Sequence, residues 1–165
     1  MPYIHYYYGS GAGKTSSAMG LLIRASAVME VCAVQFLKDG SSGEIRALEK
    51  LGIPVYAVTG GVKFIRSMTD EDKRRITERH NEILKQAAGG EYGLIVLDEL
   101  SDAFANGLVD REAVLSLLRC PPCELVITGH KPVEEFTSKA DYLTEFICHE
   151  HPYKKGVTAR KGIEF

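Results

Sequence analysis

Tyr8-Gly9-Ser10-Gly11-Ala12-Gly13-Lys14-Thr15 is the stretch that decides the fold of this chain. Its three glycines permit positive φ angles and close backbone approach, so that successive N–H groups can form a concave nest for anionic oxygens. The lysine supplies a compact positive charge and the threonine hydroxyl a ligand for magnesium, while a helix that begins here directs the positive end of its dipole at the phosphates. The stretch predicts a P-loop that binds a nucleoside triphosphate.

The residues on either side of the loop agree with a turn from a strand into a helix. A tyrosine-rich run precedes the loop, and apolar side chains at helical spacing follow it at Ala18, Leu21, Leu22, Ala25 and Val28. The general pattern Gly-x-x-x-x-Gly-Lys-Ser/Thr has glycine where this chain has Tyr8. A glycine-rich turn can also serve packing alone, but this context favours a P-loop.

A second motif lies far downstream in the sequence. Residues Leu94-Ile95-Val96-Leu97-Asp98-Glu99 form an apolar run that closes on two carboxylates. In P-loop proteins an acid at the end of a buried strand is the usual partner of magnesium. The two motifs together predict nucleotide binding but do not specify the reaction.

Length and composition limit the class of protein. A chain of 165 residues fits one domain, spanning residues 1–165, with a full apolar core. Lysine and arginine total 20 against 22 aspartates and glutamates, so the net charge of −2 provides no general field for nucleic acid or an anionic membrane. No apolar run is long enough to cross a bilayer, and the N-terminus lacks the pattern of a signal peptide. We therefore expect a cytoplasmic protein.

Four cysteines leave two interpretations open. Cys120-Pro121-Pro122-Cys123 has the spacing of a zinc knuckle or redox pair, and Cys148, His149 and His151 supply further ligand types. A second Cys-x-x-Cys is missing, however, and two adjacent prolines make a stiff turn. A loop of small residues is the alternative to a metal site.

Strands and helices alternate along the whole chain without a linker or repeat. Strands are expected at residues 4–8, 31–37, 53–58, 94–97, 125–128 and 142–147, and helices at residues 14–28, 43–51, 69–88 and 111–118. The third helix begins with a capping residue and acids at Thr69-Asp70-Glu71-Asp72, and it carries His80 on its apolar stripe as a core-edge residue. Short apolar strands separated by helices predict an α/β fold with a mostly parallel sheet of about six strands and helices on both faces.

A series of motifs then points to one family. In chain order these motifs are the loop at 8–15, Val34-Gln35-Phe36-Leu37-Lys38, Gly43-Glu44, Leu97-Asp98-Glu99-Leu100 with Gly107-Leu108, Thr128-Gly129-His130 with Pro132, Ala140-Asp141 with Thr144-Glu145, and His151-Pro152-Tyr153 through Gly162-Ile163-Glu164. The chain resembles the P-loop type ATP:corrinoid adenosyltransferases over nearly its whole length. The resemblance implies a RecA-like P-loop domain, and the family signature Gly-x-Gly-x-Gly-Lys-Thr accounts for Tyr8.

The resemblance implies a reaction in which cobalt(I) of a corrinoid attacks carbon 5′ of ATP and inorganic triphosphate leaves. ATP would be bound by Gly9-Ser10-Gly11-Ala12-Gly13-Lys14-Thr15, with Lys14 and Glu99 as the catalytic residues. Thr15 and Glu99 would hold Mg²⁺ or Mn²⁺ directly or through water, with Asp98 as the alternative carboxylate. The resemblance also implies a homodimer and a flavoprotein as electron donor.

Other positions match the family, and each also has a purely structural interpretation. Arg24 either reaches the nucleotide or is a solvated helix residue. Gln35 and Glu44 either line the cleft or make structural hydrogen bonds. His130, where many relatives carry arginine, is a phosphate contact or the cap of a turn. The basic run from His151 to the C-terminus is a triphosphate contact or an ordered tail.

The corrinoid side departs from the family pattern. Many relatives have Phe-x-Trp or Phe-x-Phe where the aromatics displace the lower ligand of cobalt, whereas Phe64-Ile65-Arg66 keeps only Phe64. The substrate is then a corrinoid without a lower nucleotide loop, or Met68 or a partner subunit supplies the second wedge. The competing class is a P-loop ATPase or a nucleoside-kinase-like protein without corrinoid chemistry.

Overall fold

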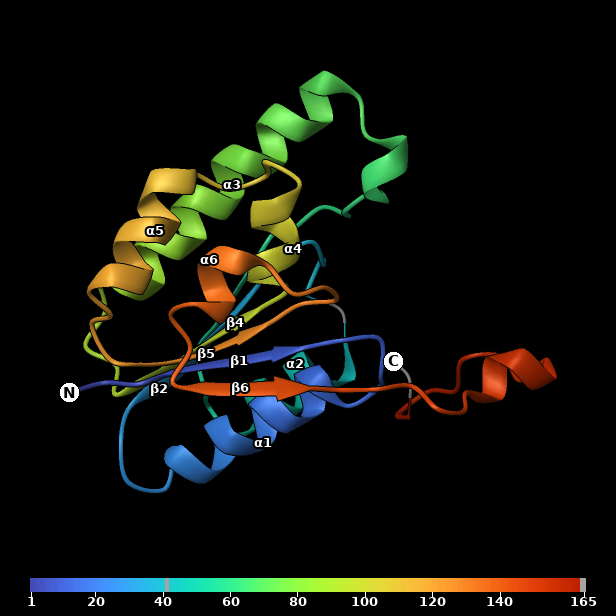
Figure 1. The fold of residues 1–165 in the computed structure, drawn as a ribbon, viewed down its shortest axis with the longest axis horizontal. Coiled ribbons are helices and arrows are strands. Elements are labelled where there is room, and N and C mark those ends of the chain that lie inside the picture. Colours follow the sequence, from blue (N-terminus) through green and yellow to red (C-terminus); the bar gives the residue numbers. More distant parts are fainter. Residues whose placement is uncertain (41, 164–165) are drawn as a thin grey trace.

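Six parallel strands form one sheet, in the spatial order β3-β2-β4-β5-β1-β6 (Figure 1). The computed structural model describes residues 1–40 and 42–163. Its strands are β1 (Ile4–Tyr8), β2 (Val31–Gln35), β3 (Val55–Ala57), β4 (Leu94–Asp98), β5 (Glu124–Thr128) and β6 (Tyr142–Glu145). The prediction of a mostly parallel six-stranded sheet is confirmed, and every strand pair in this sheet is parallel.

Helices cover both faces of the sheet, as predicted. Figure 1 shows α1 (Lys14–Ala25) and α2 (Gly43–Lys50) below the sheet, and α3 (Asp70–Ala88), α4 (Leu100–Ala105), α5 (Arg111–Arg119) and α6 (Glu134–Thr137) above it. Short 3₁₀ helices lie at η1 (Ile65–Ser67) and η2 (Pro152–Lys155). The sequence patterns did not indicate α4 or α6. Of the helices in the described residues, none combines the length and apolar character that a bilayer crossing requires.

The central strands face two separate apolar cores. In β4, Val96 packs with the residues of α1 and α2, while Ile95 and Leu97 pack with those of α3, α4 and α5. Because successive strand side chains point to opposite faces, a strand covered on both sides is apolar throughout. This explains why β4 reads as a continuous apolar run, and it leaves the first polar side chains at the strand's carboxyl end.

The start of α3 follows its sequence signal closely. The Thr69 hydroxyl accepts a hydrogen bond from the Asp72 backbone N–H at 3.2 Å, and the Thr69 N–H donates to Asp72 Oδ2 at 3.0 Å. This reciprocal capping box satisfies two N–H groups that the first helical turn leaves without partners. The predicted capping site is therefore confirmed.

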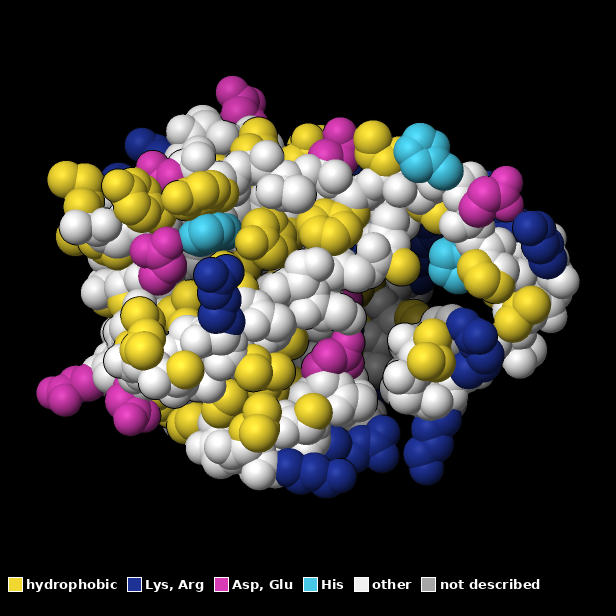
Figure 2. Space-filling model, turned by 90° about the horizontal axis from the view of Figure 1, so that it is seen from below, with side chains coloured by type: hydrophobic (Ala, Val, Ile, Leu, Met, Phe, Trp, Pro, Cys, Tyr) yellow, Lys and Arg dark blue, Asp and Glu magenta, His cyan; other side chains and the backbone are white. Residues whose placement is uncertain are grey.

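Strand β6 at the edge of the sheet differs from the expectation of a covered strand. All four of its residues are exposed, and within the described residues it pairs only with β1. The chain then runs past the P-loop and continues into the C-terminal arm, residues 148–163. This arm projects beyond the strand ends at the right of Figure 1, and Figure 2 shows several lysine and arginine side chains on it. Strand β6 therefore adds little to the apolar core. Its role in the fold is to position the segment that follows it beside the P-loop.

Candidate functional site

The glycine loop lies where β1 ends and α1 begins, at the carboxyl edge of the sheet. Gly9 and Gly13 have φ angles of 119° and 98°, which favour glycine. Gly11 has ordinary φ, but a Cβ atom there would lie 2.8 Å from the carbonyl carbon of Phe146. The Gly11 N–H donates to the Phe146 carbonyl oxygen at 2.7 Å. Two glycines are thus required by backbone conformation and the third by the close approach of the segment after β6.

The first turn of α1 carries the two polar side chains of the loop. Lys14 Nζ donates to the Gly11 carbonyl oxygen at 2.8 Å, which folds the lysine over the loop. Burial lowers the pKa of Lys14, although the nearby carboxylates Asp102, Glu99 and Asp98 oppose that effect. The basic side chain is therefore held at the loop beside acidic groups at the end of β4 and on α4.

Asp98 organises the polar end of β4. Its Oδ1 accepts hydrogen bonds from the Thr15 and Thr128 hydroxyls, both at 2.8 Å. Its Oδ2 accepts from Lys38 Nζ at 2.9 Å and faces Gln35 Nε2 at 3.4 Å. The residue is fully buried, so these donors replace the water that an ionised carboxylate otherwise requires. Asp98 thereby joins the ends of β2, β4 and β5 to the start of α1.

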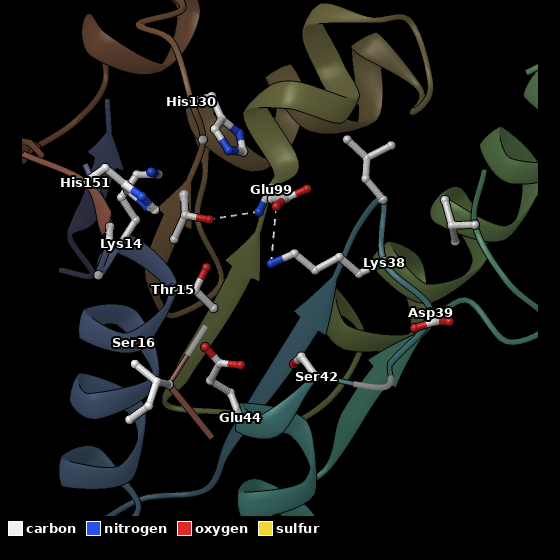
Figure 3. Close-up of a pocket in the computed structure, with 17 residues that line it drawn as sticks. Lys14, Thr15, Ser16, Lys38, Asp39, Ser42, Glu44, Glu99, His130 and His151 are labelled. Atoms are coloured by element: carbon white, nitrogen blue, oxygen red, sulfur yellow. Dashed lines mark hydrogen bonds and ion pairs between the residues drawn. The ribbon is translucent and has the colours of Figure 1, made fainter. Parts of the chain in front are cut away.

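Glu99 is held in an unusual backbone conformation next to this cluster. Its φ angle is 60°, and its N–H donates to Thr128 Oγ1 at 2.9 Å. Burial raises the pKa of Glu99, while the ion pair with Lys38, at 3.2 Å, opposes that effect. Burial alone would lower the pKa of Lys38, but Asp98 and Glu99 raise it above its ordinary value. Figure 3 shows Lys38 reaching across the site toward Glu99.

These groups open into a cavity of about 600 Å³ (Figure 3). The residues that line it come from the loop and the first turn of α1, from the segment between β2 and the start of α2, from the β3–α3 connection, from the ends of β4 and β5, and from the segment after β6: Ala12, Gly13, Lys14, Thr15, Ser16, Leu37, Lys38, Asp39, Ser42, Glu44, Val62, Glu99, Thr128, Gly129, His130, His151 and Ile163. Glu99 lines the cavity, whereas Asp98 lies behind Thr15. The two predicted carboxylates therefore have different positions.

A second cavity of about 780 Å³ adjoins the first. The two share Leu37, Lys38, Val62, Glu99 and His130 as lining residues. The second cavity is also lined by Lys63, Phe64, Ile65, Arg66, Asp102 and Asn106. Phe64 is 89% exposed, so its ring is available at this surface. Met68, the expected substitute for a second aromatic, instead lines a different cavity, between the loop at residues 58–63 and α3.

His130 stands at the boundary of the two cavities. Its Nδ1 lies 3.0 Å from Asp102 Oδ2, and its backbone N–H donates to the same oxygen at 3.0 Å. The hydrogen bond with Asp102 raises the pKa of His130 despite partial burial. When it is protonated, the imidazole can bind an anion at this place. The sequence did not indicate Asp102, because it lies on the unexpected helix α4.

A buried histidine fixes the turn that carries Lys38. Leu37 has a φ angle of 57°, and its N–H donates to His80 Nε2 at 3.2 Å. Since Nε2 accepts, Nδ1 carries the proton and donates to the Leu108 carbonyl oxygen at 2.7 Å. His80 is fully buried, so the expectation of a core-edge residue understated its burial. Its spacing on the stripe of α3 indicated a core position but not its contact with Leu37.

The structure brings other predicted residues to the site unequally. Glu44 lines the cavity, and Gln35 lies against Asp98. Arg24, by contrast, lies exposed in the last turn of α1, about 15 Å along the helix axis from Lys14 at 1.5 Å per residue. It is not among the residues that line the cavity.

The C-terminal arm and the cysteines were the remaining candidates. His151 and Ile163 line the first cavity, whereas Glu164 of the expected motif lies outside the described residues.

Cys120 is exposed and Cys123 is buried, and both are free thiols. Within residues 1–40 and 42–163, no group of three or more His, Cys, Asp or Glu side chains is placed to hold a metal ion. A zinc site therefore has no support in this part of the chain.

The parallel sheet, the glycine loop ahead of α1, and the Thr15–Asp98 hydrogen bond define a P-loop nucleotide-binding protein. The family model for ATP:corrinoid adenosyltransferase BtuR/CobO/CobP matches residues 1–165, and the chain belongs to that family. The resemblance inferred from the sequence motifs is confirmed.

Similar proteins carry consistent names. The corrinoid adenosyltransferase of Pseudomonas aeruginosa is 33% identical over 95% of this chain and 80% of its own length. Those of Sinorhizobium sp and Escherichia coli K12 are each 27% identical, over 95% and 96% of this chain and 77% and 83% of their own lengths. The family and these names indicate an ATP:corrinoid adenosyltransferase and do not favour an ATPase or nucleoside kinase.

Proposed function

We propose that this protein transfers the 5′-deoxyadenosyl group of ATP to cobalt(I) of a corrinoid. In this reaction the cobalt–carbon bond forms as the bond between carbon 5′ and the triphosphate oxygen breaks, and triphosphate leaves with that electron pair. The observation that carries the proposal is the shared wall of two cavities, one lined by the P-loop and the other by Phe64. A two-substrate transfer needs adjoining sites, whereas hydrolysis of ATP needs one site and a water.

The P-loop has the role of stabilising the leaving group. Negative charge accumulates on the triphosphate as the carbon–oxygen bond breaks, and fixed donors that meet this charge lower the barrier. We assign this role to the backbone N–H groups of residues 9–15 other than Gly11, whose N–H donates to Phe146, to Lys14, and to the amino end of α1. Cobalt(I) is itself the nucleophile, so the chain needs to supply neither a covalent nucleophile nor a base.

The oxygen-rich donor set near Thr15 fits a hard divalent cation. The Thr15 hydroxyl and the Glu99 carboxylate line the cavity, and Gln35 Oε1 is a buried oxygen that lacks a hydrogen-bond partner within the described residues. Mg²⁺ prefers such oxygen ligands and retains several waters. We propose that Thr15 and Glu99 hold Mg²⁺ or Mn²⁺ directly or through water, and that Asp98 orients Thr15. The metal would supply positive charge to the phosphates.

The second cavity is the proposed corrinoid site. Phe64 presents an exposed aromatic ring there, and Arg66 occupies the position of the second aromatic in many relatives. Since Met68 lines another cavity, it gives no support for a substitute wedge. We therefore propose a preference for a corrinoid that lacks a lower nucleotide loop, with a partner subunit as the other source of a wedge.

Three further features remain predictions from the resemblance and the sequence. These are a homodimer, a flavoprotein that reduces the cobalt, and a cytoplasmic location. A contact of Arg24 with the nucleotide also stays a prediction, and its position at the far end of α1 does not favour it.

The test is anaerobic conversion of chemically reduced cob(I)alamin and cob(I)inamide with Mg-ATP. Adenosyl-cobalt would be followed by its absorption spectrum and triphosphate would be assayed in the same samples. We expect one triphosphate per adenosyl-cobalt, faster conversion of the cobinamide, and loss of both products in Lys14→Ala. ATP binding with release of phosphate and no adenosyl-cobalt would instead identify a P-loop ATPase.

A further inference from the structure

One cation lies where the two predicted metal-binding carboxylates converge. Lys38 Nζ is 2.9 Å from Asp98 Oδ2 and 3.2 Å from Glu99 Oε1. The Asp98 side chain is fully buried and that of Glu99 is 18% exposed. Two adjacent carboxylates with so little access to water require a counter-ion. Lys38 supplies that positive charge.

The position of Lys38 is built into the fold. Leu37 and Glu99 are the non-glycine residues with positive φ in the described part of the chain, and each lies next to a member of this ion-pair cluster. Such conformations persist only where the surroundings fix them. The buried His80 fixes Leu37, and Thr128 fixes Glu99. Lys38 is therefore directed at the carboxylates by the backbone on both sides.

Lys38 also has room to move. Its side chain is 32% exposed and lines both cavities, including the one that contains Lys14 and Thr15. A lysine stem is flexible and its ammonium group binds phosphate as a point charge. Since like charges repel, the ammonium group and a divalent cation cannot both lie against the Glu99 carboxylate. A metal that binds Glu99 beside Thr15 must displace Lys38 from that carboxylate, and a nucleotide phosphate in the first cavity would offer the ammonium group a new partner.

We propose that Lys38 is an exchangeable internal cation. It holds Asp98 and Glu99 before nucleotide binds, and it transfers to the triphosphate when the metal enters together with the nucleotide. This makes binding of metal alone unfavourable and couples metal affinity to nucleotide affinity. The inference rests on the proposed nucleotide and metal site, but not on the corrinoid reaction.

The first test measures binding of Mn²⁺ alone, by electron paramagnetic resonance of the free ion, to the wild type and to Lys38→Met. We expect the variant to bind Mn²⁺ at least about tenfold more tightly, since removal of one neighbouring positive charge favours a divalent ion. Lys38→Arg keeps the charge and should bind Mn²⁺ weakly, as the wild type does. Lys50→Met, an exposed lysine at the end of α2, is the matched control and should leave Mn²⁺ affinity unchanged.

The second test measures affinity for a fluorescent ATP analogue with and without Mn²⁺. In the wild type Mn²⁺ should strengthen nucleotide binding strongly. In Lys38→Met this enhancement should fall by about tenfold, because the metal no longer releases a lysine to the phosphates. Circular dichroism and thermal unfolding would verify that each variant is folded, and Lys38→Gln would repeat the test if the methionine variant folds poorly.

Two outcomes would overturn the inference: Mn²⁺ binding to Lys38→Met no tighter than to the wild type, or an unchanged enhancement of nucleotide binding by Mn²⁺. Failure of the proposed function would give a different experimental result. In that case the wild type would bind Mn²⁺ and ATP with the expected coupling, yet form no adenosyl-cobalt from either corrinoid.

Discussion

The two adjoining cavities are built in different ways. The polar centre of the P-loop cavity lies at strand ends and the first turn of α1. There a single carboxylate, Asp98, accepts hydrogen bonds from the Thr15 and Thr128 hydroxyls and from Lys38. The second cavity takes most of its distinctive residues from the connection between β3 and α3, where Phe64 is 89% exposed, and the others, Asp102 and Asn106, from α4 and its C-terminal end. The phosphate site is therefore organised at the ends of the sheet strands, whereas the proposed corrinoid site depends largely on a surface connection, a kind of segment that varies more readily than a core strand.

The largest expected effect comes from Asp98→Asn, which attacks the pre-formed cavity at its centre. The variant keeps the shape of the side chain but removes the charge that faces Lys38 and one acceptor for the hydroxyls. We expect the free energy of unfolding to fall by about 3 kcal/mol, the cost of breaking a buried ion pair. Urea unfolding would measure this change, and ATP titration should show strongly reduced affinity.

Asp70→Asn is the matched control for that experiment. Asp70 is exposed in the first turn of α3, where loss of its charge should cost only about 0.5 kcal/mol through the helix dipole. Equal stability losses in Asp98→Asn and Asp70→Asn would mean that Asp98 does not organise the cavity.

The next effect compares two glycines of the same region. Gly11→Ala places a Cβ atom 2.8 Å from the Phe146 carbonyl carbon, so the backbone after β6 must shift. We expect a loss of about 2 kcal/mol in the free energy of unfolding, with weaker ATP binding. Gly20→Ala, in the exposed middle of α1 with no atom within 4 Å of its Cβ, should instead stabilise the protein by about 0.5–1 kcal/mol.

Calorimetry and ATP titration on both variants would distinguish the two positions. Equal behaviour of Gly11→Ala and Gly20→Ala would contradict the interpretation that the segment after β6 presses against the loop.

A pH dependence probes the turn that both cavities share. Burial lowers the pKa of His80 below its ordinary value of 6.5, so between the native and unfolded pKa values the unfolded chain binds more protons. Stability is therefore complete above about pH 6.5 and falls as the pH drops toward the native pKa, by up to about 1.4 kcal/mol per pH unit. Urea unfolding at about pH 7.5 and about pH 5.5 would measure this difference in the free energy of unfolding.

His80→Gln removes this titration while keeping a group that can hydrogen-bond. Its unfolding should depend less steeply on pH than that of the wild type over the same interval. An identical pH dependence in both proteins would assign the loss of stability to other groups.

The smallest effect on stability is expected from Phe64→Ala, in the loop-built cavity. Because the ring is almost fully exposed, the free energy of unfolding should change by less than about 0.5 kcal/mol. ATP affinity should be unchanged, while the KM for the corrinoid should rise in the adenosylation assay. Leu51 is another exposed apolar residue, and Leu51→Ala should change neither the ATP affinity nor the KM for the corrinoid. A loss of ATP affinity in Phe64→Ala would show that the two cavities are not independent.

The parts of the site that sequence reasoning found are those with a local signal. The glycine loop, the acids Asp98 and Glu99 at the end of β4 and the capping box of α3 each occupy a few consecutive residues, and their chemistry can be recognised without the fold. The roles of Lys38, Asp102 and His80 lacked such a signal. Each depends on a partner far away in the chain, such as Lys38 on Asp98 or His80 on the Leu37 N–H.

Some errors have the same origin. The sequence predicts covered strands at residues 142–147 and 31–37, yet β6 is exposed, and β2 ends at Gln35 because Leu37 takes a positive φ and turns its N–H toward His80. Helix α4 escaped detection because it spans only Leu100–Ala105, which is too short for a helical period to be evident. Packing rather than local propensity stabilises elements of this length.

The sequence by itself determined the α/β class, the P-loop and the family, because these depend on apolar periodicity and on contiguous motifs. Only the tertiary structure decided that Gly11 accommodates Phe146, that Asp98 lies behind Thr15 while Glu99 faces the cavity, and that Lys38 neutralises both acids. The physical reason is that a parallel sheet gathers the carboxyl ends of distant strands at one edge. Charges that are far apart in the chain become neighbours there, and their ion pairs and hydrogen bonds follow from strand order and register.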